Sequence, residues 1–361
     1  MNKKNRIARI FALLLSCILL FSSCASSAGE TLMSLGNAKI SVNMYRLWLS
    51  RVKGAYGGAD DSVWQETNDD GRTYDEIFTE YVTQNAKTFL CALYEFDKLG
   101  LKLPDAEKEK IENTMNEILT ERAGGSKSEL NSMLANYGVN YNILKEIYTI
   151  EAKTAYLEEY LFGEGGTEKI TDEQRDEYYK SEYVRIKQIF FYTANKPVTD
   201  NEGNYTYDDE GCVVTRDYTE EEIAEQKEKA ALITASLTSG QDFDLLMAQS
   251  EDAASQSYPN GYYFTRSSQY VAEVVGAAFS LSEGEFTTVE SEYGIHIIKR
   301  LPLDEKGYAA KTNADFFTDF EDNLRTGLFT ARLVAYEDDI KINESLLRKY
   351  SVASSASNSY Y

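Results

Sequence analysis

The run Tyr-Gly-Ile-His-Ile-Ile-Lys at residues 293–299 constrains the fold more than any other stretch of the chain. Its β-branched apolar residues predict a buried strand. Within it lies His296, the only histidine among 361 residues. Upstream, Ala-Ala-Phe-Ser-Leu at 277–281 is followed by Glu-Gly-Glu, which predicts a short helix ending at a glycine turn. An aromatic strand is predicted at 262–264, after a Pro-Asn-Gly turn.

Two earlier segments extend this pattern. Residues 183–191 alternate and are rich in aromatic and β-branched types, which predicts a strand that contains Gln188. A Ser-Glu-Asp-Ala-Ala-Ser segment contributes Asp252. Taken in order, these segments resemble a parvulin-type peptidyl-prolyl isomerase domain. The resemblance implies a small antiparallel sheet surrounded by helices over residues 181–302, so we expect an α+β fold.

The resemblance also implies a set of site residues. His296 takes the place of the family's second histidine, and Gln188 stands where the family has its first. Asp252 matches the Cys or Asp that faces the substrate carbonyl, and Ser291 matches a Ser or Thr near the histidine pair. The substrate-binding residues expected from the resemblance are Tyr270, Val274, Phe264 and Gln269.

X-Pro isomerisation requires no nucleophile, because the barrier of about 20 kcal/mol comes from amide resonance. A site can lower it with an apolar slot, water exclusion and hydrogen bonds to the twisted amide. Gln188 can hydrogen-bond to His296 but cannot titrate, and Val274 replaces an aromatic residue. We expect a parvulin-type peptidyl-prolyl isomerase, and these two departures leave a weak or lost activity as the alternative. One histidine and no CxxC exclude the usual zinc patterns, and we expect no cofactor and no metal.

Long amphipathic helices are predicted on both sides of this domain. The clearest covers residues 74–99, where apolar residues recur at three- and four-residue spacing before Gly100 and Pro104. In their order, the flanks 31–180 and 303–350 resemble the chaperone part of bacterial foldases such as PrsA and SurA. That resemblance implies one helical chaperone domain built from both flanks.

The first residues form a targeting signal. Four basic residues precede a short apolar core in residues 1–23, which predicts a signal peptide rather than a membrane span. The sequence Phe-Ser-Ser-Cys resembles a bacterial lipobox, so we expect acylation of Cys24 and a lipid-anchored tether at 24–30; a plain secretory signal is the alternative. The expected location is extracytoplasmic, on the bacterial cell membrane.

The net charge of −22 argues against nucleic acid as a partner, because phosphate backbones bind basic surfaces. Two further segments complete the domain map. Turn signals at Glu-Gly-Asn and Glu-Gly predict a β-hairpin insertion at 193–217. The Ser-rich residues 351–361 are expected to be a disordered tail.

Three functions compete. The first is an extracytoplasmic folding factor, an isomerase and chaperone that acts on unfolded or nascent secreted polypeptides with X-Pro bonds. The second is a non-catalytic chaperone with a degenerate parvulin domain. The third is a solute-binding lipoprotein, which requires two lobes of alternating strands and helices. The long helical first half disfavours this last class.

Overall fold

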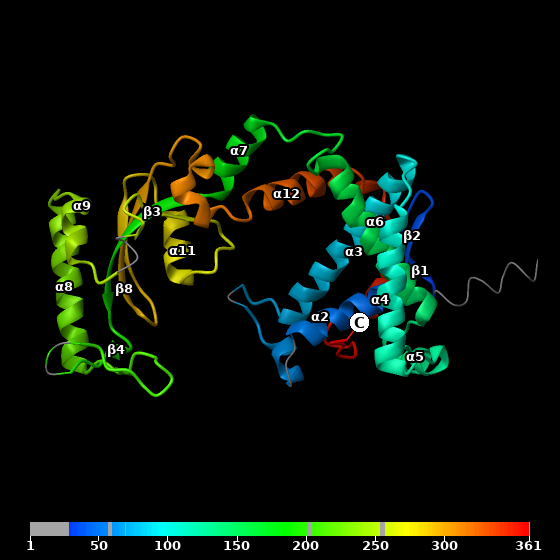
Figure 1. Cartoon of the computed structure of the whole chain (residues 1–361), viewed down its shortest axis with the longest axis horizontal. Helices are drawn as coiled ribbons and strands as arrows, with labels where there is room; N and C mark the ends of the chain where they lie inside the picture. Colours follow the sequence, from blue (N-terminus) through cyan, green and yellow to red (C-terminus); the bar gives the residue numbers. More distant parts are fainter. Residues whose placement is uncertain are drawn as a thin grey trace, which may run out of the picture. The chain divides into compact units, whose positions relative to one another are not determined.

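The computed structural model of the chain describes residues 29–360 except 57–59, 69, 201, 203 and 253–256. These residues form two compact units (Figure 1). The first joins the described residues up to Lys169 with those from Arg325 onward, and the second runs from Ile170 to Leu324. The second unit is thus inserted into the sequence of the first. The predicted signal peptide and Cys24, the predicted acylation site, lie outside the described residues.

The first unit is mainly helical. Its helices are α2 (Val42–Tyr56), α3 (Tyr74–Lys98), α4 (Asp105–Ala123), α5 (Lys127–Leu134), α6 (Tyr141–Phe162), α13 (Glu344–Leu347) and the part of α12 (Phe320–Val334) from Arg325. The helix predicted from apolar spacing at 74–99 is confirmed as α3. It begins with a capping box between Thr73 and Glu76, and its apolar face is buried at Val82, Ala86 and Leu90. Among the described helices, none combines the length and apolarity that crossing a bilayer requires.

A small antiparallel sheet ties the two ends of this unit together. Its strands are β1 (Thr31–Leu35), β2 (Ala38–Ser41) and β9 (Lys341–Ile342), in the order β2-β1-β9. Met33 on β1 pairs with Ile342 on β9. The flank 303–350 is expected to be helical, with helix from 313 to 350. The structure has helix there in α12 and α13, but at β9 the chain is extended and pairs with the edge of β1 that β2 leaves open.

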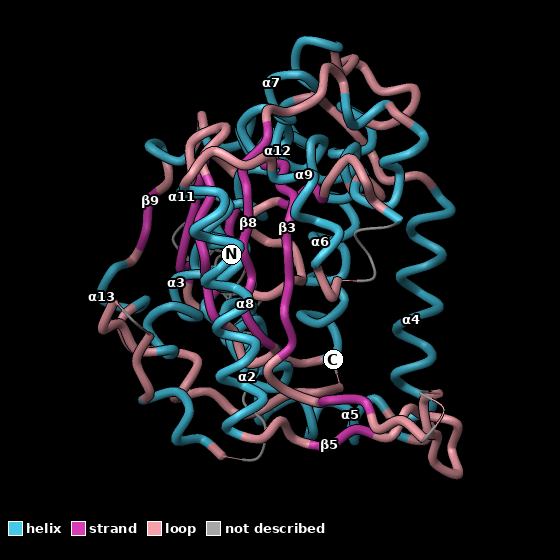
Figure 2. Tube along the Cα trace, turned by 90° about the vertical axis from the view of Figure 1, so that its left-hand side faces the viewer, coloured by secondary structure: helices cyan, strands magenta, loops and turns pink. Residues whose placement is uncertain are grey.

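The second unit carries the strands predicted for the parvulin-like domain. Its elements are α7 (Asp172–Glu182), β3 (Val184–Tyr192), β4 (Lys196–Pro197), β5 (Thr215–Arg216), α8 (Glu220–Thr238), α9 (Phe243–Leu246), β6 (Tyr262–Phe264), α11 (Ala272–Ser280), β7 (Phe286–Glu290) and β8 (Gly294–Leu301). The main sheet has the order β6-β3-β8-β7, and all its pairs are antiparallel. Figure 2 shows β3 and β8 side by side at its centre.

Helices cover both faces of this sheet (Figure 1). Ile189 on β3 and Ile297 on β8 point toward α8 and pack with Ile233. The alternate residues point toward α11, where Ile186 and Ile298 share a core cluster with Val274 and Ala278. The period of two along each strand therefore separates a purely structural face from the face that carries Gln188 and His296.

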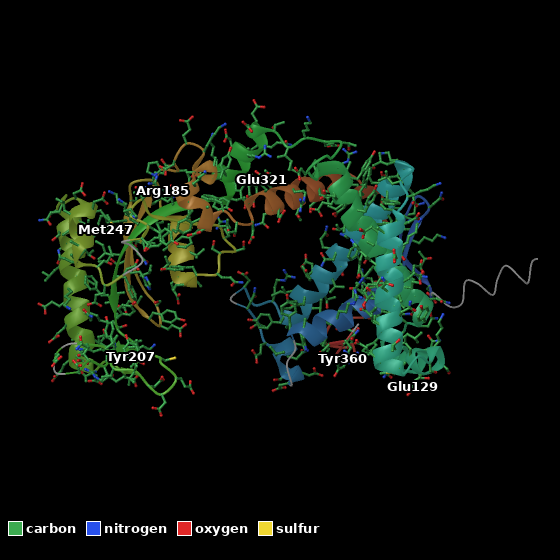
Figure 3. The ribbon with its side chains drawn as sticks, viewed as in Figure 1. Glu129, Arg185, Tyr207, Met247, Glu321 and Tyr360 are labelled. Atoms are coloured by element: carbon green, nitrogen blue, oxygen red, sulfur yellow. The ribbon has the colours of Figure 1, made fainter. Side chains whose placement is uncertain are left out.

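The predicted hairpin insertion is present. Strand β4 pairs with β5, and two further bridges join Thr199 to Tyr205 and Tyr207 to Val213. The segment therefore makes two turns, one more than a simple hairpin. Tyr207, labelled in Figure 3, keeps 61% of its surface exposed.

The expectation of a disordered segment at 351–361 does not fit the structure over residues 351–360. Val352 is fully buried and Asn358 is 2% exposed. The backbone N–H of Asn358 donates to the carbonyl of Ser50 on α2 at 3.0 Å. The Ser-rich composition predicted disorder. The segment is instead held mainly by contacts to its backbone, and composition gives no information about such contacts.

Candidate active site

The imidazole of His296 is buried on one face of the sheet. His296 sits on the central strand β8 directly opposite Phe190 on β3, and its side chain is 2% exposed. The ring centroids of His296 and Phe190 are 4.4 Å apart. Because residues directly opposite in an antiparallel pair share one face, the strand register itself fixes this stacking.

Gln188 connects His296 to an acidic group. It is 2% exposed, and its side-chain Nε2 donates to Oδ2 of Asp252 at 2.7 Å and to the hydroxyl of Tyr270 at 2.9 Å. Its Oε1 lies 3.3 Å from Nδ1 of His296. A carboxylate can only accept hydrogen bonds, so it orients the amide with Oε1 toward the imidazole. The Gln188 carboxamide therefore links His296 to Asp252 through two hydrogen bonds.

The tautomer of His296 follows from these partners. Oε1 of Gln188 is an acceptor, so Nδ1 carries the proton and donates to it. The unprotonated Nε2 then accepts from the hydroxyl of Ser291, whose Oγ lies 2.8 Å away. Ser291 Oγ in turn accepts from the backbone N–H of Tyr293 at 3.2 Å.

Asp252 is positioned by its neighbours. Its Oδ2 accepts from the hydroxyl of Tyr262 at 2.7 Å. Two residues earlier, Oγ of Ser250 accepts from the backbone N–H groups of Phe190 and Asp252, at 2.9 and 3.1 Å. These hydrogen bonds hold the Ser-Glu-Asp segment against the end of β3 and thereby position the Asp252 carboxylate.

Burial controls the ionisation of this cluster. It lowers the pKa of His296 from 6.5 to about 4, and the negative charges of Asp252 and Glu273 oppose this only in part. Burial likewise raises the pKa of Tyr262, assisted by its hydrogen bond to Asp252. The imidazole is neutral at pH 7, and Tyr262 remains a hydrogen-bond donor.

All four residues expected to be catalytic thus meet in one hydrogen-bonded cluster: His296, Gln188, Asp252 and Ser291. The four residues expected to bind substrate differ in their exposure to solvent. Tyr270 belongs to the cluster and is 39% exposed. Phe264 is 5% exposed and contacts the ring of Tyr270, with centroids 4.9 Å apart.

Val274 is fully buried in the core between α11 and the sheet. A peptide could reach Val274 only after this core opened. In the present conformation Val274 therefore packs in the core and does not face a substrate. Gln269 is exposed and lines a 640 Å³ cavity together with Tyr270, Glu273, Glu292 and Tyr293. This cavity adjoins the hydrogen-bonded cluster around His296, because Gln188 donates to the hydroxyl of Tyr270 and the backbone N–H of Tyr293 donates to Ser291 Oγ.

Three residues of the cluster were not expected: Phe190, Ser250 and Tyr262. A signal for Phe190 was present, because a strand places residues 188 and 190 on the same face. Tyr262 stood in the predicted aromatic strand, but only the pairing of β6 with β3 brings its hydroxyl to Asp252. Ser250 acts through a loop, whose course the residue pattern does not predict.

Comparison with known proteins identifies this unit. One protein family, described as the PPIC-type PPIASE domain, matches residues 178–301. No curated protein matches the chain. Among solved structures, PrsA from Bacillus subtilis is 20% identical, with 81% of this chain and 91% of that chain covered and a TM-score of 0.25.

Two further PrsA structures are similar to the chain. PrsA from Bacillus cereus is 20% identical, with coverages of 80% and 97% and a TM-score of 0.29. The foldase protein PrsA from Streptococcus pneumoniae is 16% identical, with coverages of 78% and 96% and a TM-score of 0.23.

The sheet, the helices on its two faces and the family match define residues 178–301 as a peptidyl-prolyl isomerase domain of the parvulin class. Domains of this class act on the peptide bond before proline in polypeptide substrates. In this chain Gln188 stands where the resemblance predicts a histidine, and the domain interrupts the sequence of a helical unit.

Proposed function

We propose that the protein is an extracytoplasmic folding factor in which an active parvulin domain isomerises X-Pro bonds of unfolded secreted polypeptides while the helical unit acts as a chaperone. The observation that carries the proposal is the continuous chain of hydrogen bonds Ser291–His296–Gln188–Asp252 within the family-matched domain. Gln188 supplies both a donor and an acceptor at the position of the missing histidine, so the chain remains unbroken.

The carboxylate of Asp252 is the group proposed to act on the substrate amide. In a planar amide, resonance places partial negative charge on the carbonyl oxygen, and twisting returns that charge to nitrogen. A carboxylate near the carbonyl oxygen therefore destabilises the planar amide more than the twisted one. Only such differential interactions lower the barrier, and each 1.4 kcal/mol corresponds to about a tenfold rate increase.

His296 is proposed to be a positioning residue. Its neutral imidazole donates to Gln188 and accepts from Ser291, so it orients the carboxamide that holds Asp252. Because the ring is 2% exposed and its pKa is lowered to about 4, it offers no positive charge at pH 7. The proposed mechanism requires no proton transfer, because the reaction forms and breaks no covalent bond.

The location and the partners are part of the proposal. A basic start, a short apolar core and the Phe-Ser-Ser-Cys sequence support export and acylation at Cys24. The clients would be nascent or unfolded secreted chains, whose unstructured X-Pro bonds are accessible. The formal charge of −22 supports a partner other than nucleic acid.

A non-catalytic chaperone is the second candidate, and the burial of Val274 and the loss of a histidine at Gln188 favour it. A refolding assay separates the two. The slow phase of a protein whose folding is limited by proline isomerisation should accelerate with the wild-type chain and much less with Asp252→Ala. Suppressed aggregation with no acceleration by either chain would establish the non-catalytic alternative.

A further inference from the structure

Residues 351–360 lie along helices α2 and α3 of the first unit, and the body of the unit contacts their backbone. The N–H groups of Val352 and Ala353 donate to Thr79 Oγ1 at 2.9 Å and to Asp75 Oδ1 at 2.7 Å. The carbonyl of Ala353 accepts from Nζ of Lys53 at 2.9 Å. These hydrogen bonds are made to peptide N–H and carbonyl groups, which every polypeptide possesses.

The second half of the segment is held in the same manner. The N–H of Asn358 donates to the backbone carbonyl of Ser50 at 3.0 Å, and the carbonyl of Ser357 accepts from the hydroxyl of Tyr137 at 3.4 Å. Only Val352 and Asn358 bury their side chains, whereas Ser354, Ala356 and Ser357 are exposed. The binding thus relies on two anchor side chains and on the backbone between them.

Lys53 and Gly54 on α2 form part of the surface that this segment covers. The Lys53 side chain is 6% exposed, and its partners are Asp61 at 3.1 Å and the carbonyl of Ala353. A buried ammonium needs such acceptors, because its desolvation is otherwise costly. At Gly54, a Cβ atom would overlap the backbone carbonyl of Asn358. The helix surface therefore provides a cationic donor and a gap that fits a peptide backbone.

We propose that this surface, formed by Ser50, Lys53, Gly54, Asp75 and Thr79, is a polypeptide-binding groove that residues 351–360 occupy in the free protein and that an extended segment of an unfolded client occupies when they leave. The proposal rests on the proposed chaperone function and names the surface that serves it. The groove is defined mainly by backbone recognition, so its ligand class is extended polypeptide with small side chains, one branched apolar anchor and one amide anchor.

The groove also sets the direction of its ligand. Asp75 accepts the N–H of Ala353, while Lys53 donates to the carbonyl of the same residue. A chain running in the opposite direction would exchange N–H and carbonyl groups and leave the buried ammonium facing a donor. Clients are therefore expected to bind in the direction of residues 351–360.

Competition with a covalently attached segment weakens the apparent affinity for any client. A short tether gives an attached ligand an effective concentration on the order of millimolar, so a free peptide of the same sequence should barely bind the intact chain. Deletion of residues 351–361 exposes the groove. A fluorescein-labelled peptide with the sequence of residues 351–360 should then bind at least about tenfold more tightly than to the intact chain, as measured by fluorescence anisotropy.

A matched substitution tests the location. In the deleted chain, Gly54→Ala places a methyl group where the backbone of Asn358 lies, and it should abolish peptide binding with no change in the circular-dichroism melt. A permanently unfolded protein, reduced and carboxymethylated lysozyme, should displace the bound peptide. If deletion prevents folding, the full chain with Val352→Ser and Asn358→Ala should replace it, because it loosens the segment without removing it.

Two results would overturn the proposal: a folded chain with the segment deleted or loosened that does not bind the peptide, or bound peptide that the unfolded protein does not displace. The isomerase rate of the same samples separates this outcome from a failure of the proposed function. A normal rate without peptide binding overturns the groove alone. An intact chain without isomerase activity contradicts the proposed function, whatever the groove binds.

Discussion

Oε1 of Gln188 lies 3.3 Å from Nδ1 of His296, on the neighbouring central strand of the sheet. The same carboxamide donates to Asp252 at 2.7 Å, so one neutral residue joins the imidazole and the carboxylate. A histidine at this position could make similar bonds, but it would add a second titrating ring. The glutamine preserves the connection and removes that titration.

Removal of the Gln188 carboxamide should therefore damage the site and the fold together. In Gln188→Leu, His296 and Asp252 each lose a buried partner, which typically costs about 1–3 kcal/mol. We expect the isomerase rate to fall at least about tenfold, equivalent to about 1.4 kcal/mol, and the second unit to unfold at lower urea concentration.

The control for this change is Lys187→Gln, one residue earlier and on the opposite face of β3. Lys187 pairs with Asp244, and the two side chains are 14% and 63% exposed; an ion pair with one partner in solvent contributes little, and glutamine keeps most of the length of the Lys187 side chain. Both rate and stability should remain near wild type in the control. A Gln188→Leu chain as active as this control would show that the connection has no catalytic role.

The stability of the second unit should depend on the protonation of His296. Its pKa is about 4 in the folded chain and 6.5 without burial. The unfolded chain therefore binds the proton more readily, and stability rises with pH across this window. The contribution is complete above pH 6.5 and is lost as the pH falls through 4, with a total of roughly 3 kcal/mol.

Urea unfolding at pH 7 and pH 4.5, compared between wild type and His296→Gln, measures this contribution. Carboxylates titrate in both chains, so the difference between the two losses isolates the histidine. Wild type should lose roughly 2 kcal/mol more than the variant. Equal losses would mean that the imidazole is solvated and protonates freely.

In the first unit, Glu95 should carry much of the attachment of α12. It is 1% exposed and accepts from Arg332 at 2.6 Å and from the hydroxyl of Tyr336. Glu95→Ala leaves these donors without their buried acceptor, so we expect the free energy of unfolding to fall by about 2 kcal/mol. The isomerase rate, which reports on the second unit, should be retained.

Glu80 on the same helix provides the comparison. It pairs with Arg72, and both side chains are largely exposed, at 68% and 49%. Glu80→Ala should change the free energy of unfolding by less than about 0.5 kcal/mol. If urea denaturation gives equal effects for the two glutamates, the buried network does not hold α12.

The elements that the sequence predicted are those with strong local signals. Helix α3 combines apolar periodicity with a capping box at Thr73. Strand β8 contains a run of β-branched residues, which favour strands over helices. The residues of the proposed site were named individually by the parvulin resemblance. Local pattern and family motif together therefore predicted four residues that the structure joins by hydrogen bonds.

The missed elements depend on distant partners. Strand β9 has two residues and forms only against β1, at the other end of the sequence. Residues 351–360 are ordered through their backbone, so a Ser-rich composition predicts disorder where the groove imposes structure. Tyr262 joins the cluster only through strand pairing. Such interactions have no short-range signature in the sequence.

The most direct test of the account is the cis–trans isomerisation rate of a short proline-containing peptide with wild type, His296→Ala and Asp252→Ala. Asp244→Ala, a change at an exposed side chain of the same unit, serves as the control. We predict a wild-type and control rate clearly above the uncatalysed rate, and at least about a tenfold loss in each of the other two chains. Equal rates at the uncatalysed level in all four folded chains would contradict the claim that this cluster is an active site.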